Sequence, residues 1–294
     1  MTESFKQRLK RAPAVLAPGA YDALSALLIE QAGFEAIYIS GAAIAYTQLG
    51  RPDIGLVAFD QVADVVGRIH ERTSLPLIVD ADTGYGNALN VQRTVRVLEQ
   101  RGATAIQIED QSFPKRCGHL AGKSIVPTSE MVGKVRAAAD ARRSSDTLII
   151  ARTDAIAVEG MTAALDRAGA YLEAGADILF VEAPRTREEM QTVVGAVGGR
   201  APLIANMVEG GRTPMFDLED LGALGFQLVI SPGAIVRALI PVAEEFLASL
   251  KTHGATKPFA GRMIDLAGVN ARIGLDEIIA HGAQYDPAAN EPAE

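Results

Sequence analysis

The sequence predicts an α/β protein that folds as a TIM-type (β/α)8 barrel with extra helices at its C-terminal end. Eight short apolar segments are separated by longer segments in which apolar residues recur at helical spacing. The short segments are apolar throughout rather than alternating, which is typical of parallel strands covered by helices on both faces. Eight strand–helix units spread over about 250 residues match the length of such a barrel.

A doubly wound parallel sheet is the competing fold, because it is also built from alternating strands and helices. The even number of units and the lack of an early Gly-x-Gly-x-x-Gly segment favour the barrel. We therefore expect residues 1–254 to form a catalytic barrel and residues 255–286 to form a helical extension. Residues 287–294 are expected to be a disordered tail.

The individual elements follow from apolar spacing and from the residues that interrupt it. The expected strands are residues 15–17, 37–40, 77–80, 105–109, 148–152, 178–182, 203–206 and 228–231. The expected helices are residues 22–31, 59–72, 91–100, 129–142, 163–173, 187–197, 218–224 and 235–250. Pro18-Gly19 is expected to end the first strand, and Gly33 the helix before the second. Thr186 and Glu189 have the spacing of a capping box.

Short helical segments are also expected outside the repeating units. Residues 1–12 form an amphipathic lead-in, with Phe5 and Leu9 at helical spacing. In the extension, residues 262–269 and 275–281 have the spacing of short helices.

Charge and composition exclude several classes of partner. The net charge of −8 argues against nucleic acid or an anionic membrane surface. The N-terminal residues are polar, and no apolar run approaches the roughly 18 residues that span a bilayer. A single cysteine rules out a disulfide framework and suits a reducing compartment. We expect a soluble cytoplasmic protein.

Polar and charged residues follow the expected strands, and the carboxyl ends of barrel strands meet at one opening. These residues are Tyr21, Asp22, Ser40, Gly41, Ala42, Asp80, Asp82, Glu109, Asp110, Arg152, Asp154, Glu182, Asn206, Ser231 and Pro232, with Arg237 nearby. They are too many for solubility alone and predict a site at this opening. For Asp110 and Asp154 a structural role, capping helices or holding neighbouring strands, is the alternative.

Three of these residues form a candidate metal site. Asp80, Asp82 and Glu109 offer hard oxygen ligands and have no histidine or thiolate close in sequence. Such ligands suit Mg²⁺ or Mn²⁺ rather than zinc. Arg152 and Arg237 are suited to grip the carboxylates of a substrate.

Cys117 lies in the segment Lys115-Arg116-Cys117-Gly118-His119. Fixed cations and an imidazole beside a thiol lower its pKa from the ordinary value of about 8.5. A lone cysteine in a basic loop is the alternative interpretation. The carboxylates expected at the nearby strand ends favour a reactive thiol.

Four segments resemble motifs of the isocitrate lyase/phosphoenolpyruvate mutase superfamily. They are Asp80-Ala81-Asp82-Thr83-Gly84-Tyr85-Gly86, Ile108-Glu109-Asp110-Gln111, Lys115-Arg116-Cys117-Gly118-His119 and Ala151-Arg152-Thr153-Asp154. The cysteine segment is most similar to that of 2-methylisocitrate lyases and 2,3-dimethylmalate lyases. The resemblance implies a Mg²⁺-dependent barrel and a mobile loop that carries the cysteine. It also implies a homotetramer in which the last barrel helix is exchanged between subunits.

The resemblance also implies the roles of individual residues. The expected metal ligands are Asp80, which binds directly, and Asp82 and Glu109, which act largely through water. The expected catalytic residues are Lys115, Arg116, Cys117, His119 and Arg152. The residues expected to bind the substrate are Tyr38, Ser40, Gly41, Ala42, Asp53, Gly118, Glu182, Asn206 and Arg237.

The implied reaction cleaves the C2–C3 bond of a small carboxylic acid that carries a 2-hydroxyl group. Pyruvate leaves, and Cys117 protonates the carbanion of the other fragment. Methylisocitrate lyases carry a glycine where this chain has Ala42, and residues 207–214 are more similar to those of dimethylmalate lyases. Both 2-methylisocitrate and 2,3-dimethylmalate therefore remain candidate substrates. The alternatives are oxaloacetate hydrolase or decarboxylase and phosphonopyruvate-type mutases of the same superfamily; Cys117 weighs least against the hydrolase. A non-catalytic metabolite-binding barrel would show a degraded site, and a Schiff-base aldolase would need a lysine at a strand end.

Overall fold

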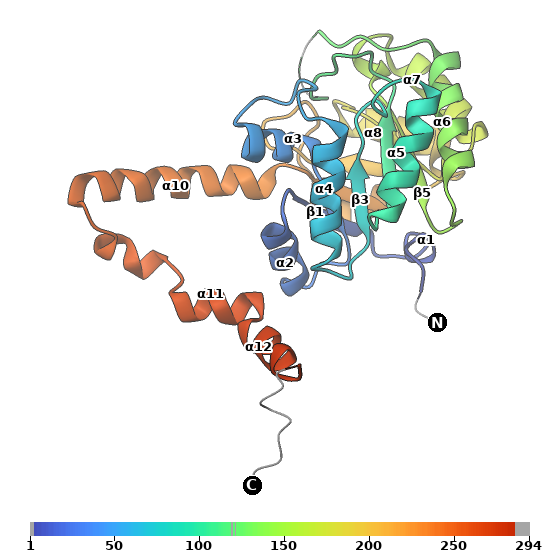
Figure 1. The fold of residues 1–294 in the computed structure, drawn as a ribbon. Helices are drawn as coiled ribbons and strands as arrows, with labels where there is room; N and C mark the ends of the chain where they lie inside the picture. Colours follow the sequence, from blue (N-terminus) through green and yellow to red (C-terminus); the bar gives the residue numbers. More distant parts are fainter. Residues whose placement is uncertain (1–2, 119, 121, 286–294) are drawn as a thin grey trace. The chain divides into compact units, whose positions relative to one another are not determined.

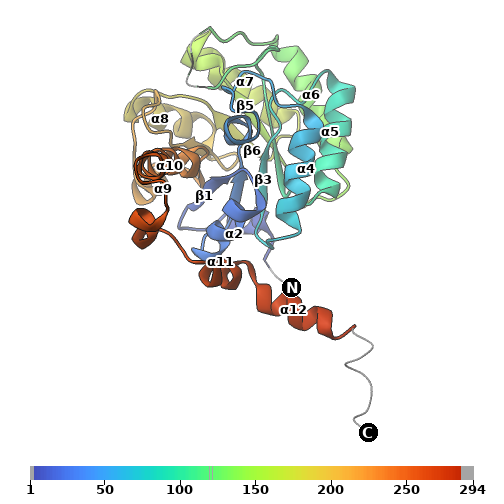
Figure 2. The same ribbon diagram turned by 60° about the vertical axis from the view of Figure 1, so that its left-hand side comes forward.

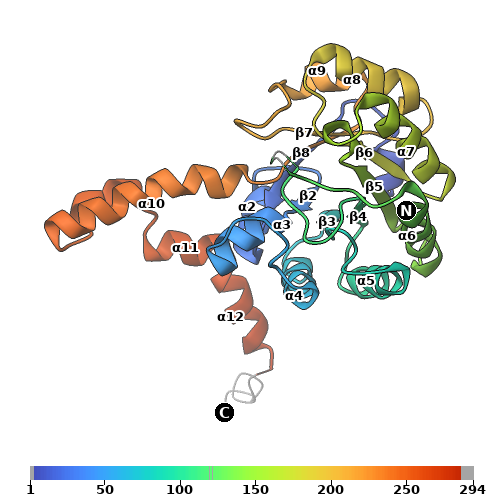
Figure 3. The same ribbon diagram turned by 90° about the horizontal axis from the view of Figure 1, so that it is seen from above.

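The computed structural model describes residues 3–118, 120 and 122–285. The chain divides into two compact units, Met1–Arg237 and Ala238–Glu294, and the first contains eight parallel strands. They are β1 (Val15–Ala20), β2 (Ile37–Ile39), β3 (Leu77–Asp80), β4 (Ala105–Glu109), β5 (Leu148–Thr153), β6 (Ile178–Val181), β7 (Ile204–Asn206) and β8 (Leu228–Ser231). The strand order is β6-β5-β4-β3-β2-β1-β8-β7, and a parallel bridge between Leu179 and Leu203 joins the two ends. The predicted barrel fold is confirmed, as the view in Figure 3 shows.

Helices surround the strands on the outside of the barrel. They are α2 (Ala23–Gln31), α4 (Phe59–His70), α5 (Ala88–Gln100), α6 (Thr128–Ala141), α7 (Met161–Glu173), α8 (Arg187–Val193) and α9 (Leu218–Leu224). Helices α4, α5 and α6 lie side by side along one flank (Figures 1 and 2). Each covers an apolar strand face, which explains why the strands show no alternation in sequence.

Side chains that alternate along each strand build two apolar layers. Tyr38 and Phe180 belong to a buried cluster inside the barrel, whereas Ile39 and Val181 pack beneath the helices. Helix α1 (Phe5–Arg8) contributes Phe5 to the inner cluster, and Arg8 pairs with Glu35 just before β2. Helix α1 therefore closes the amino-terminal end of the barrel and leaves the carboxyl ends of the strands for the site.

The first strand is longer than predicted, and a helix follows the second strand. Strand β1 continues through Pro18 and Gly19, because residues 15–18 pair with β8 and residues 19–20 pair with β2. A Cβ at Gly19 would overlap the backbone of Pro232, so glycine is required for this close approach. Helix α3 (Gly41–Ile44) is capped by Ser40, whose Oγ accepts from Ala43 N at 3.2 Å. It continues as a π-helical turn, Ala45–Leu49, which apolar spacing did not indicate.

Side-chain caps explain other differences at helix ends. Helix α5 starts three residues earlier than predicted because Asn87 Oδ1 accepts from Leu89 N and Asn90 N at 2.9 and 3.3 Å. The predicted cap Thr186 accepts from Glu189 N at 3.1 Å. The carboxylate of Glu189, however, accepts from Arg185 N instead of completing the capping box.

The second unit begins within the last predicted barrel helix and contains both helices expected in the extension, the first of them at residues 266–273 instead of 262–269. Its elements are the end of α10 (Ala234–His253), a 3-10 segment (Lys257–Arg262), α11 (Leu266–Ile273) and α12 (Leu275–Ala283). The expected tail, residues 287–294, lies outside the described residues. Among the helices that the structure describes, none combines the length and apolar character needed to cross a membrane.

Candidate active site

The carboxyl ends of the strands enclose a narrow cavity of about 70 Å³. Its lining residues are Tyr38, Ser40, Ala42, Tyr46, Asp53, Asp80, Glu109, Lys115, Arg116, Cys117, Gly118, Arg152, Glu182, Asn206, Val208, Pro232, Gly233 and Arg237. Most of the residues selected from the sequence therefore meet at one place. Gly41 does not line this cavity, but it lies next to Asp80: a Cβ built on Gly41 would be 3.4 Å from Asp80 Oδ2. Asp82 faces a neighbouring cavity, and His119 lies outside the described residues.

Three lining residues were not selected from the sequence. Tyr46 belongs to the unexpected π-helical turn, and Val208 follows β7 in a loop. Gly233 lies next to Pro232, where β1 and β8 come together. The one sequence signal for Gly233 was that it directly follows Pro232, which had been selected at the end of a strand.

Lys115 forms ion pairs with two carboxylates beside the cavity. Its Nζ lies 2.6 Å from Asp53 Oδ1 and 2.7 Å from Asp82 Oδ1, and all three side chains are at most 10% exposed. Burial lowers the pKa of Lys115, but the carboxylates of Asp82 and Asp53 outweigh burial and raise this pKa well above its usual value. Lys115 is therefore a fixed positive charge and not a proton acceptor.

Burial makes the ionised forms of Glu109 and Asp82 costly, although each has a cationic neighbour. Burial raises the pKa of Glu109 well above its usual value although Arg152 opposes the shift. Burial likewise raises the pKa of Asp82 to about 7, with Lys115 opposing and Asp80 adding to the rise. Among the described residues, Glu109 Oε1 is buried without a hydrogen-bond partner. Such an orphaned oxygen is suited to a cation or to water bound to one.

These carboxylates fit a divalent cation that keeps much of its water. In the part of the chain that the structure describes, no three His, Cys, Asp or Glu side chains converge as a ready set of ligands. Asp80 Oδ1 already accepts from Asp82 N at 3.1 Å and from Gln107 Nε2 at 3.3 Å. The hard carboxylate oxygens of Asp80 and the unpartnered Glu109 Oε1 would suit Mg²⁺, which keeps several waters in protein sites.

Arg152 is the central cation of the cavity. Its Nε lies 2.9 Å from Asp154 Oδ2 and 3.3 Å from Glu109 Oε2, and Nη2 lies 4.0 Å from Glu182 Oε1. The guanidinium carbon stacks over the ring of Phe180 at 5.1 Å from the centroid. These contacts hold the guanidinium in one orientation, as binding of a substrate carboxylate requires.

Gly118, which follows the cysteine, lies against the guanidinium of Arg152. A Cβ at Gly118 would overlap the guanidinium of Arg152 and the carboxylate of Glu182, so any larger residue would displace these side chains. Cys117 N donates to Asp53 O at 3.2 Å, and the thiol borders the cavity. The adjacent residue Arg116 is anchored by Gln111, which bonds both its backbone N and its backbone O. The segment therefore places a thiol at the opening of the carboxylate-lined cavity.

Residues 5–251 match the family model described as phosphoenolpyruvate phosphomutase. The chain belongs to the phosphoenolpyruvate phosphomutase family. The resemblance found in the sequence motifs is thereby confirmed.

Two similar members of this family carry the names of lyases. The chain is 42% identical to the 2,3-dimethylmalate lyase of Eubacterium barkeri, covering 93% of this chain and 94% of the relative. It is also 42% identical to the 2-methylisocitrate lyase of Aeropyrum pernix, covering 98% and 92% of the two chains.

Solved structures agree with this placement in the phosphoenolpyruvate phosphomutase family. The crystal structure of a 2,3-dimethylmalate lyase, described as a PEP mutase/isocitrate lyase superfamily member, matches with a TM-score of 0.91. It has 35% identity to this chain and covers 98% and 97% of the two chains. A phosphonopyruvate hydrolase in complex with oxalate and Mg²⁺ matches with a TM-score of 0.86, 31% identity and coverage of 95% and 97%.

In this member of the phosphoenolpyruvate phosphomutase family, Asp110 holds neighbouring strands together, which was the alternative to a role in the site. Its carboxylate accepts from Thr153 Oγ1 at 2.7 Å, from Asp154 N at 2.9 Å and from the Tyr171 hydroxyl at 2.8 Å. These bonds tie the end of β4 to the end of β5 and to α7. Asp110 therefore holds the backbone that presents Arg152.

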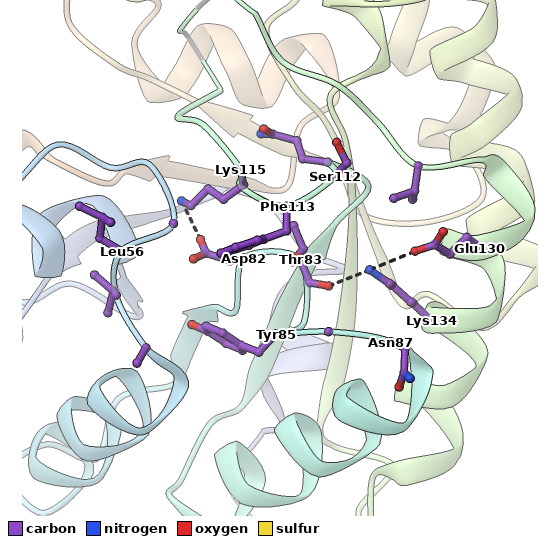
Figure 4. A pocket seen from close by; sticks show the side chains of 16 residues that line it. Leu56, Asp82, Thr83, Tyr85, Asn87, Ser112, Phe113, Lys115, Glu130 and Lys134 are labelled. Carbon is purple, nitrogen blue, oxygen red and sulfur yellow. Dashed lines mark hydrogen bonds and ion pairs between the residues drawn. The ribbon is translucent and has the colours of Figure 1, made fainter.

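A second, larger cavity of about 710 Å³ lies beside the first (Figure 4). Lys115 lines both cavities, and its ion pair with Asp82 is drawn in Figure 4. Leu56 and Phe113 lie near its opening and are 51% and 74% exposed. The larger cavity contains neither Arg152 nor Cys117, so we assign the chemistry to the smaller one.

Proposed function

We propose that this protein is a carbon–carbon lyase. It cleaves a substituted malate- or isocitrate-type 2-hydroxy acid, of the 2,3-dimethylmalate or 2-methylisocitrate class, to pyruvate and a carboxylic acid. The observation that carries the proposal is the position of Gly118 against Arg152, which places the neighbouring Cys117 in a cavity lined by Asp80 and Glu109. The two relatives named as lyases support it, because their similarity extends over nearly the whole chain.

We propose Mg²⁺ as the cofactor, with Mn²⁺ as a substitute. Asp80 would hold the ion directly, and Asp82 and Glu109 would reach it largely through water. The unpartnered Glu109 Oε1 and the related hydrolase structure with oxalate and Mg²⁺ support this assignment. Bound there, the ion would make the 2-hydroxyl group of the substrate easier to deprotonate.

The residues of the chain then bind the substrate and deliver a proton. Ser40, Gly41 and Ala42 bind the carboxylate that becomes the carboxylate of pyruvate. The proton of the 2-hydroxyl group passes to solvent, the oxygen forms the new carbonyl group, and the electron pair of the C2–C3 bond passes to C3. The Sγ of Cys117 gives its proton to C3, which releases the second carboxylic acid, and the thiolate regains a proton from solvent.

Charged residues around the cavity stabilise this step. Arg152 and Lys115 are fixed cations that lower the energy of the charge developing on the carboxylate fragment. Arg116 and His119 are proposed to assist them. Arg237, whose side chain pairs with Glu209 at 2.9 Å, would close the far side of the substrate site together with Glu182 and Asn206.

A substrate screen tests the proposed function directly. The purified protein with Mg²⁺ would be offered 2,3-dimethylmalate, 2-methylisocitrate, isocitrate, oxaloacetate and phosphonopyruvate, and formation or loss of 2-keto acid would be measured. We expect the highest kcat/KM for one of the first two compounds. Fastest turnover of oxaloacetate or phosphonopyruvate would refute the lyase assignment, and no turnover of any compound would favour a binding protein.

We further propose that the protein is a homotetramer in which the last barrel helix is exchanged between subunits. In α10, Leu239, Ile240 and Leu247 are 50%, 49% and 59% exposed, and none of the residues of α11 or α12 is buried. Apolar helix faces of this extent are typical of surfaces that a partner covers. Light scattering is expected to give four times the mass of one chain. Replacing Leu247 by glutamate should lower this mass, whereas a monomeric wild-type protein would contradict the proposal.

A further inference from the structure

Lys123 is a buried lysine outside the substrate cavity. Its side chain is 1% exposed, and Nζ lies 2.6 Å from Asp154 Oδ1 and 2.5 Å from the carbonyl oxygen of Gly118. The side chain of Asp154 is fully buried. An ammonium group at this depth is tolerated only with such charged and polar partners. The contact with Gly118 links Lys123 to the cysteine segment.

Asp154 connects Lys123 to the cavity. The same carboxylate accepts two hydrogen bonds from Arg152, from Nε at 2.9 Å and from Nη2 at 3.1 Å. The ammonium group of Lys123 therefore fixes the backbone of Gly118 directly. Through Asp154 it also helps to fix the orientation of Arg152. Gly118 in turn lies directly on that guanidinium without room for a Cβ.

We propose that Lys123 is a positioning residue that sets the distance between the Cys117 thiol and the Arg152 guanidinium. This inference rests on the proposed lyase function. Lys123 does not line the substrate cavity, so it acts only through Gly118 and Asp154. Without its ammonium, the backbone at Gly118 loses its tie to Asp154, and the thiol is no longer held over the carbon that it protonates.

Cys117 is the only cysteine, so the rate of its alkylation by N-ethylmaleimide reports the position of one thiol. In Lys123→Met we expect alkylation about tenfold faster than in the wild type, because the backbone at Cys117 and Gly118 is held less firmly. We expect kcat to fall by about 10- to 100-fold, as a displaced proton donor implies, with a smaller change in KM. The melting temperature should stay within about 4 °C of the wild type.

Matched variants separate this role from general destabilisation. Lys134 is similarly buried, but its ammonium contacts Thr83 O at 3.3 Å and Glu130 at 3.6 Å. Lys134→Met should therefore leave the alkylation rate unchanged. Lys123→Arg keeps the positive charge and should recover part of kcat, whereas Asp154→Asn should speed alkylation as Lys123→Met does.

Two results would overturn the proposal. One is an unchanged alkylation rate in both Lys123→Met and Asp154→Asn; the other is equal acceleration in Lys134→Met. Alkylation is measured without substrate, so it tests the positioning even if the lyase assignment fails. Absent turnover in the wild type with faster alkylation of Lys123→Met would refute only the proposed function.

Discussion

Replacing Cys117 by serine is expected to lower kcat by on the order of 10²-fold or more, with little change in KM. A serine hydroxyl is a far weaker acid than a thiol, whose ordinary pKa is about 8.5, so it cannot deliver the proton to C3 in time. The size of the side chain changes little. The backbone bonds from Cys117 N to Asp53 O and from Leu120 N to Cys117 O remain available. Steady-state release of pyruvate with the preferred substrate measures the effect.

The location of solvent deuterium tests which carbon is protonated. In wild-type enzyme acting in D₂O, one deuterium should appear at the cleaved carbon of the non-pyruvate product, because the thiol exchanges with solvent. A structural cysteine would give a different result, namely a lower melting temperature and nearly normal turnover per folded molecule. A serine variant with wild-type kcat would take Cys117 out of the mechanism.

The barrel and most of the cavity were predictable because they depend on local sequence. Apolar strands with polar ends identify Asp80, Glu109 and Arg152, and parallel strands of a barrel bring such ends together regardless of the details of the loops. Local exceptions arose where contacts between distant segments decide the outcome. Strand β1 continues past Pro18 because β8 and β2 offer it partners, which no window of sequence reveals.

The ion pairs of Lys115 and Lys123 were not predictable, because they depend on the path of the loop between β4 and α6. Lys115 was selected from its motif, but nothing in the sequence indicated that its ammonium pairs with Asp53, sixty-two residues earlier in the chain, and with Asp82. Lys123 gave no signal, since its importance appears only when its ammonium meets Asp154 inside the protein. Tyr46 was missed because Ser40 caps a short helix that places it on the cavity.

Removal of divalent cations is expected to abolish activity, and added Mg²⁺ or Mn²⁺ is expected to restore it. In Asp80→Asn, activity should be at least about 10²-fold lower than in the wild type at saturating Mg²⁺, because an amide is a poor ligand for a hard cation. Asparagine keeps an oxygen that can accept from Asp82 N and Gln107 Nε2, so the end of β3 should stay in place. Pyruvate release after EDTA treatment, followed by titration with each metal, is the measurement.

Thermal unfolding gives a second readout that does not depend on the substrate. At a free Mg²⁺ concentration of 100 times Kd, binding to the folded state alone stabilises it by about 2.7 kcal/mol. Wild-type protein should therefore melt at a higher temperature with Mg²⁺ than with EDTA, whereas Asp80→Asn should show little difference. Asp60→Asn removes an exposed carboxylate at the start of α4 and should behave like the wild type in both assays. Activity that persists after thorough chelation, or an equal Mg²⁺ response in Asp80→Asn, would contradict the metal assignment and leave Arg152 and Lys115 as the charges that stabilise the reaction.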